Sequence, residues 1–262
     1  MAGSRRVPEG PAPEPAVQKL RIRYAKRGRM RFTSTRDFQR ALERAVRLAR
    51  LPMAFSGGFH PHPKISYANA APTGAASEAE YVEISVTQVV DPAEVAARLD
   101  AALPDGLDVL EVVDAADQPG ALADALQGSV WAMRFRAGEA PPPAEGEVAE
   151  SRMASAVTAL LGRGELLVTR MMKKGPRDID VRAAILDLVV AAEPVAGVPA
   201  AEGDVVLLAS LRHTTPTVRP EEIWTALREV SREDWPRPVS TRLRQGPVDG
   251  VDVADTVGTP PV

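Results

Sequence analysis

The sequence predicts an α+β protein of two blocks, each a strand–helix–strand–strand–helix succession whose antiparallel sheet is covered by helices. Two observations support this prediction. Segments with period-two alternation of apolar residues flank segments with the 3.6-residue helical period, and this order occurs twice. A tandem ferredoxin-like arrangement is one candidate for such a pattern. We place the blocks at residues 18–127 and 128–234, between proline-rich segments at 1–17 and 235–262 that we expect to be disordered tails.

The first block opens with a strand at residues 19–24. Three apolar residues alternate there with Lys19, Arg21 and Arg23, which predicts a half-buried strand with a basic outer face. After a turn signal, the alternation around residues 29–32 predicts a second short strand or a continuation of the first.

A helix at about residues 36–50 is the clearest element of the chain. Ser34 or Thr35 can cap its first turn, and apolar residues recur on one side at helical spacing. The opposite side carries five arginines, with one acid, Glu43, interspersed among them. These are Arg36, Arg40, Arg44, Arg47 and Arg50. Because like charges on one stripe repel one another unless something faces them, the stripe is a candidate surface for an anionic partner.

The rest of the first block alternates strands and a helix. Pro52 ends the preceding helix. Strands are expected at residues 64–68, 77–88 and 107–113, and a helix at 91–103. By parity, Glu80 shares the inward face of its strand with apolar residues, so we expect it to form a structural ion pair with a cationic partner.

The second block repeats this order. Strands are expected at residues 130–136, 166–172, 179–190 and 204–213, and helices at 147–161 and 220–230. Lys173 and Lys174 fall in a turn between two of these strands. The turn is either a solvated basic hairpin tip or a finger that contacts phosphate groups.

The net charge of −3 conceals a strong asymmetry along the chain. Residues 18–64 carry 13 lysines and arginines against two acids, a net charge of +11, whereas residues 65–150 have a net charge of −13. Three interpretations of the basic segment stay open: it faces an external polyanion, it docks on the acidic segment of the same chain, or it is merely solvated.

Composition and missing motifs exclude several classes of protein. The absence of cysteine excludes disulfides, thiolate nucleophiles, zinc fingers and protein-ligated iron–sulfur clusters. The sequence has no run of about 18 apolar residues, no secretory signal pattern, and no Walker, dinucleotide-binding or serine-elbow motif. We therefore expect a cytoplasmic protein without a membrane partner and without a cofactor.

Residues 56–64, which we call the glycine–histidine loop, form the sharpest local motif, Ser-Gly-Gly-Phe-His-Pro-His-Pro-Lys. Gly57 and Gly58 allow close backbone approach or positive φ. The alternating prolines hold the chain extended, so that His60 and His62 are expected to point the same way.

Three interpretations of this loop stay open. A metal site needs a third ligand from elsewhere, and His213 is the only other histidine, so we expect no bound metal. A rigid structural loop would use its histidines to hydrogen-bond the backbone. A ligand site would combine the glycine amides, a histidine and Lys64 around a phosphate or another polar group.

Several of these motifs resemble the DUF2344 family, also described as radical-SAM-linked proteins. The resemblance rests on Arg-Ile-Arg-Tyr-Ala-Lys-Arg-Gly at residues 21–28, Arg-Phe-Thr-Ser at 31–34, Arg-Ala-Val-Arg at 44–47, Gly-Phe-His-Pro-His-Pro at 58–63, Gly74, and Ser-Glu-Ala-Glu-Tyr at 77–81. It is strong over residues 18–115 and weaker through the second block. It implies a domain that stands alone in some bacteria and is fused behind a radical SAM enzyme in others.

One departure from the family pattern bears on catalysis. Members usually carry Ser-His where this chain has Ser34-Thr35, so we place no catalysis there. The absence of cysteine means that any radical SAM cluster must belong to a separate partner enzyme.

Three functions are therefore expected as alternatives. The first is a non-catalytic accessory protein that binds RNA or presents a substrate through the arginine stripe, the glycine–histidine loop and the Lys173–Lys174 tip. The second is a protein-interaction subunit that docks its basic helix on an acidic partner. The third is an enzyme that uses the loop histidines with Glu78 or Glu80 as acid or base.

Overall fold

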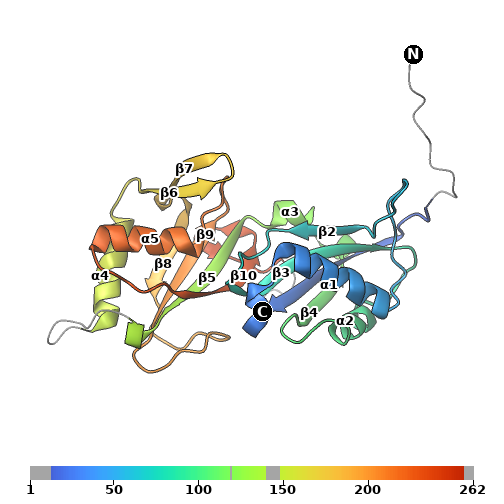
Figure 1. Cartoon of the computed structure of the whole chain (residues 1–262), viewed down its shortest axis with the longest axis horizontal. Coiled ribbons are helices and arrows are strands. Elements are labelled where there is room, and N and C mark those ends of the chain that lie inside the picture. The colour runs from blue at the N-terminus through green and yellow to red at the C-terminus, as the bar shows by residue number, and fades with distance from the viewer. Residues whose placement is uncertain (1–12, 119, 140–147, 257–262) are drawn as a thin grey trace, which may run out of the picture. The chain divides into compact units, whose positions relative to one another are not determined.

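The computed structural model describes residues 13–118, 120–139 and 148–256, and the chain divides into two compact units (Figure 1). The first unit holds residues up to 73 and from 80 to 123. The second holds residues 74–79 and 124–256. Most of the expected tail at residues 1–17 lies outside the described residues.

The first unit follows the expected order of strands and helices. Its elements are β1 (Gln18–Lys26), a 3₁₀ helix (Gly28–Phe32), α1 (Thr35–Leu48), β2 (Ile65–Ala68), β3 (Ala76–Val86), α2 (Pro92–Asp100) and β4 (Val109–Asp114). The sheet order is β4-β1-β3-β2, with β4 antiparallel to β1 and β2 antiparallel to β3. A βαββαβ succession with this order is the ferredoxin-like topology.

One core holds this unit together. Apolar side chains of β1, β3 and β4 pack with those of α1 and α2, so both helices cover the same face of the sheet. Tyr24 of β1 stacks on Phe38 of α1, with ring centroids 4.4 Å apart. The expected cap is present, since Ser34 Oγ accepts a hydrogen bond from Asp37 N–H. Burial of the apolar side of α1 leaves its arginines facing outward.

The short strand expected around residues 29–32 is wrong, because residues 28–32 form a 3₁₀ helix. Gly28 adopts φ +53° and turns the chain out of β1. The Met30 N–H then donates to the Arg27 carbonyl at 2.9 Å, and this short-range bond replaces strand pairing.

The basic outer face expected for the first strand is also wrong at Arg21. Arg21 is 1% exposed, and its Nε and Nη2 donate to Glu83 Oε1 at 3.1 and 2.9 Å. Nη2 also donates to the Gly120 carbonyl at 3.2 Å. Glu83, which belongs to the acidic segment, therefore neutralises this arginine within the unit.

The second unit has the same topology with an inserted hairpin. Its elements are β5 (Gly128–Phe135), α4 (Ala149–Leu161), β6 (Leu167–Met172), β7 (Gly175–Asp180), β8 (Ile185–Val190), β9 (Val205–Arg212), α5 (Pro220–Ser231) and β10 (Val239–Gly246). Two short strands, β11 (Val248–Asp249) and β12 (Asp252–Val253), follow and pair with each other. The order β10-β5-β9-β8 is antiparallel throughout. A short helix α3 (Leu122–Ala125) precedes it.

The β6–β7 hairpin is an addition to this topology, inserted between α4 and β8 (Figure 1). Arg170 of β6 forms a buried ion pair with Glu222 of α5 and donates to the Thr217 carbonyl at 3.0 Å, which ties the hairpin to the unit. The strand expected at residues 179–190 is two strands. Asp180 Oδ1 accepts hydrogen bonds from the N–H groups of Arg182 and Ala183, and this turn breaks the run.

The expected disordered tail from residue 235 is wrong over much of its length. Trp235 is buried and packs edge-on against Phe135, and residues 239–246 form β10. The pairing of β10 with the first residues of β3 is parallel, which departs from the expected antiparallel sheets. The tail's last residues, 257–262, lie outside the described part of the chain.

No helix among the described residues combines the length and apolarity needed to cross a membrane.

Candidate functional site

The arginine stripe on α1 is exposed to solvent along its whole length. Arg36, Arg40, Arg44 and Arg47 lie on α1 itself, and Arg50 follows just after the helix ends at Leu48. Within the described residues, its one ion pair joins Arg40 to Asp37 at 3.9 Å, between two exposed side chains of the same helix. Arg47 Nε donates to the Glu43 carbonyl at 3.0 Å. The acidic segment of the described chain therefore does not neutralise this stripe, in contrast to Arg21 of β1.

Hydrogen bonds across its base close the glycine–histidine loop. Ser56 N–H donates to the His62 carbonyl at 2.8 Å, and His62 N–H donates back to Ser56 Oγ at 3.0 Å. Lys64 N–H donates to the Ala54 carbonyl at 2.8 Å. These bonds fix the base of the loop through its backbone, so the side chains of His60, His62 and Lys64 remain exposed.

The two glycines differ in what they contribute. Gly58 has φ +116°, a conformation that side chains rarely adopt, whereas Gly57 does not have a positive φ. The loop path therefore requires glycine at residue 58.

A pocket of about 420 Å³ lies between the C-terminal half of α1 and this loop. We call it the arginine pocket, and its lining residues are Glu43, Val46, Arg47, Arg50, Leu51, Met53, Phe55, Pro61, His62 and Pro63. The end of the arginine stripe thus meets one of the two loop histidines. Six apolar residues line the pocket beside four polar ones.

The other predicted site residues lie elsewhere. Arg36, Arg40 and Arg44 continue along α1 outside the pocket lining. A further group, Gly57, Gly58, His60 and Lys64, belongs to the loop without lining the pocket. Lys173 and Lys174 form the exposed turn of the β6–β7 hairpin in the second unit.

Sequence reasoning missed Phe55 and Glu43 as pocket residues. Phe55 is exposed, and it forms an isolated antiparallel β-bridge with Pro63. An exposed aromatic beside a Gly-Pro-rich loop is a usable signal of a binding surface. Glu43 interrupts the arginine stripe in the sequence, and the i,i+4 spacing on the helix places it beside Arg47.

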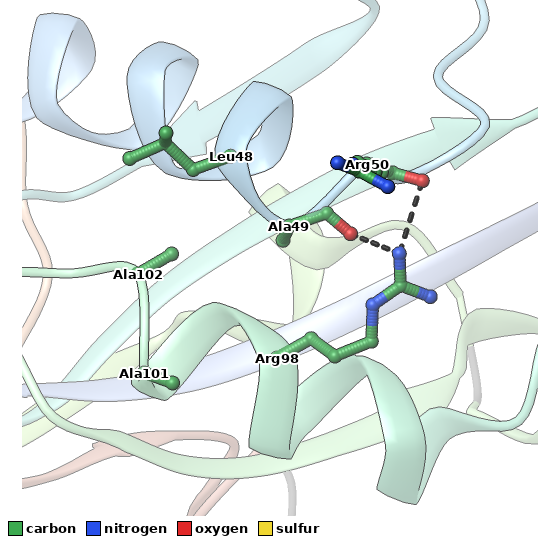
Figure 2. Close-up of a pocket in the computed structure, with 6 residues that line it drawn as sticks. All are labelled: Leu48, Ala49, Arg50, Arg98, Ala101 and Ala102. Atoms are coloured by element: carbon green, nitrogen blue, oxygen red, sulfur yellow. Dashed lines mark hydrogen bonds between the residues drawn. The ribbon is translucent and has the colours of Figure 1, made fainter.

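The C-terminus of α1, where the pocket arginines lie, is held by Arg98 of α2 (Figure 2). Arg98 Nη2 donates to the carbonyls of Ala49 and Arg50, and Nη1 donates to Glu94 at 3.1 Å. A cation on the last carbonyls of a helix satisfies their acceptors and complements the helix dipole. Arg50 then leaves the helix at φ +49°.

Glu80 is buried, as its parity predicts, and its Oε2 accepts a hydrogen bond from Ala71 N–H at 3.0 Å. Glu83 of the same strand forms a buried ion pair with Arg21.

A family model described as "uncharacterized protein conserved in bacteria (DUF2344)" matches residues 19–220. The chain belongs to the DUF2344 family. The expected family resemblance is therefore confirmed, over both units and up to the start of α5. A search of curated proteins finds no match to this chain.

The three histidines of this DUF2344 protein belong to two different units. His60 and His62 lie in the loop of the first unit, and His213 belongs to the second. Among the described residues, no group of three or more His, Cys, Asp or Glu side chains is arranged to hold a metal ion.

His213 is instead a half-buried hydrogen-bonding residue. Its Nδ1 lies 2.7 Å from the Leu126 carbonyl and its Nε2 lies 3.2 Å from Ser129 Oγ. Burial lowers the pKa of His213, the bond to Leu126 acts in the opposite direction, and the nearby Arg242 guanidinium lowers the pKa further.

We expect this histidine to make folding pH-dependent. Because its folded-state pKa lies below the unfolded value of about 6.5, the unfolded chain binds the proton first as the pH falls. The free energy of unfolding should decrease below about pH 6.5, with a slope of at most about 1.4 kcal/mol per pH unit from this group. Urea denaturation at several pH values should show that His213→Gln loses this part of the slope and His60→Gln keeps it. An unchanged slope in His213→Gln would contradict the assignment.

Proposed function

We propose that this DUF2344 protein is a non-catalytic accessory protein that binds single-stranded RNA through α1 and the arginine pocket, and that it acts beside a separate radical SAM enzyme. The chain has no cysteine with which to hold a radical SAM cluster of its own. In this arrangement the partner enzyme carries the redox chemistry, and this protein holds the RNA.

The observation that carries the proposal is the meeting of the arginine stripe with a partly apolar pocket. Phosphate groups of a strand can lie along the four exposed guanidinium groups of α1 and that of Arg50, just after the helix end. Phe55 in the pocket lining and Phe59 in the glycine–histidine loop offer exposed aromatic rings, on which unpaired bases stack. Double-stranded RNA hides its base faces, so this combination favours a single strand.

Charge pairing supports an external partner for the stripe. Basic residues on and after β1 meet acids within the first unit: Arg21 pairs with Glu83, and Arg27 pairs with Asp108 at 2.8 Å. The helix arginines have no such partner on the acidic segment among the described residues. The two halves of the basic segment therefore differ, and the helix half is left for another molecule.

A protein-interaction subunit is the second candidate. Leu48 is 65% exposed beside Arg47, and an apolar side chain among cations suits an acidic helix of a partner protein. The enzyme hypothesis has weaker support, because His60 and His62 are exposed while Glu80 is buried and bonded to Ala71.

The test is the salt dependence of RNA binding by the full chain. We expect a fluorescently labelled single-stranded RNA of about 10 nucleotides to bind at 50 mM salt, and the affinity to fall by about 200-fold between 50 and 200 mM if five or six phosphates are contacted. A duplex of the same length should bind more weakly. Failure to bind any RNA at low salt, together with capture of a protein by the same surface, would favour the second candidate.

A further inference from the structure

The arginine pocket holds a carboxylate among its cations. Glu43 lines the pocket with Arg47, one turn later on α1, and with Arg50, which follows just after the end of the helix. Within the described residues the Glu43 side chain forms no ion pair or hydrogen bond, since Arg47 bonds its backbone carbonyl instead. A half-buried acid beside two arginines that does not pair with either is available to a ligand.

A second polar group without a partner lies near the same carboxylate. Tyr67 Oη is buried and has no hydrogen-bond partner among the described residues. Burial raises the pKa of Tyr67 to about 12, and the negative charge of Glu43 contributes to the rise. Tyr67 packs edge-on against Phe38 of α1, with ring centroids 6.1 Å apart. The phenol therefore stays neutral, and no cation among the described residues pairs with the Glu43 charge.

The pocket's remaining surface suits a flat ring. Val46, Leu51, Met53, Phe55, Pro61 and Pro63 supply its apolar side. A volume of about 420 Å³ falls in the range of small-molecule sites, and it admits one unstacked base but not a stretch of duplex. Arg47, Arg50 and His62 lie at the same pocket and can hold the flanking phosphate or ribose.

We propose that the arginine pocket takes one unstacked base of the bound RNA and that Glu43 selects guanine. This inference rests on the proposed function, because the base arrives on the strand whose phosphates lie along α1. An ionised carboxylate only accepts hydrogen bonds, through two oxygens side by side. Guanine alone presents two adjacent N–H donors, N1–H and N2–H, on its Watson–Crick edge. Adenine and cytosine place an acceptor next to their amino group, and uracil flanks its single N–H with two carbonyls.

The experiment compares three labelled RNA heptamers at 100 mM salt: all uridine, and the same strand with a single central guanosine or adenosine. We expect the wild-type chain to bind the guanosine strand about tenfold more tightly than the other two, the scale of one bidentate base contact. Glu43→Gln offers one acceptor and one donor, so it should lower the ratio of guanosine-strand to all-uridine affinity from about ten to about one. Glu229→Gln, an exposed glutamate on α5, is the matched control and should keep the preference.

Guanosine 5′-monophosphate, titrated by calorimetry, separates the two proposals. RNA binding without a guanosine preference, or a preference that survives Glu43→Gln, overturns the base assignment and leaves RNA binding standing. Absence of RNA binding with Glu43-dependent binding of guanosine monophosphate overturns the proposed function and keeps the pocket assignment. Absence of both overturns both.

Discussion

Replacing Arg40 and Arg47 with glutamate should weaken single-stranded RNA binding by about 100-fold at 100 mM salt. Both side chains are exposed on α1, so each reversal removes a phosphate contact and adds a repulsive charge. The slope of log affinity against log salt should fall by about two. Fluorescence anisotropy over a series of salt concentrations measures both quantities.

The double variant should remain folded. Arg40 gives up only an exposed pair with Asp37 at 3.9 Å, and a glutamate in the last turn of α1 opposes the helix dipole, so we expect a loss of about 1 kcal/mol. Arg163→Glu with Arg212→Glu, at exposed positions of the second unit, gives the same change in net charge and should keep most of the affinity. Equal losses in both double variants would mean that only net charge matters and that α1 is not the binding face.

Replacing Glu83 with leucine should lower the free energy of unfolding by about 3–5 kcal/mol, because it leaves the buried Arg21 guanidinium without its counter-charge. Only the Gly120 carbonyl would remain as an acceptor among its hydrogen bonds. Urea or thermal denaturation of the full chain measures the loss.

Two further variants separate this ion pair from general damage. Lys19 also approaches Glu83, at 3.6 Å, but its side chain is 53% exposed, so Lys19→Met should cost less than about 0.5 kcal/mol. Arg21→Met combined with Glu83→Leu removes both charges and should recover most of the stability, since apolar replacements of buried pairs are often neutral. A double variant as unstable as Glu83→Leu alone would show that packing, not charge, causes the loss.

Periodicity predicted the elements whose environment is simple. The helical period placed α1 and separated its apolar side from its arginines, and the order of segments suggested the ferredoxin-like succession in each unit. In both the helix and the strands, one face is apolar and buried and the other faces solvent. Hydrophobic periodicity detects elements of this kind.

The errors arise where polar residues are buried on partners far away in sequence. Arg21 looks like a solvent-facing residue by alternation, yet it meets Glu83, 62 residues away. Strand β10 alternates too weakly to resemble a strand, because its Arg242 and Gln245 are buried against residues near 77–79. Residues that are neighbours in the sequence do not indicate such distant partners. These contacts can therefore be identified only from the three-dimensional structure.

The arginine pocket was only half predictable. The convergence of His62 with the end of the stripe follows from the loop starting just after the helix. The roles of Phe55 and Glu43 depend on how the chain turns after Arg50. Arg50 has a positive φ, which its residue type does not predict.

The position of β10 late in the sequence affects how the second unit folds during synthesis. On the ribosome, β5 emerges more than 100 residues before the strand that covers its open side, and until then its backbone N–H and C=O groups on that side are unpaired. The second unit therefore cannot complete its sheet until residues 239–246 have been made. A nascent or truncated chain ending before residue 239 exposes a strand edge eight residues long, which is a template for aggregation and a place for a chaperone to bind.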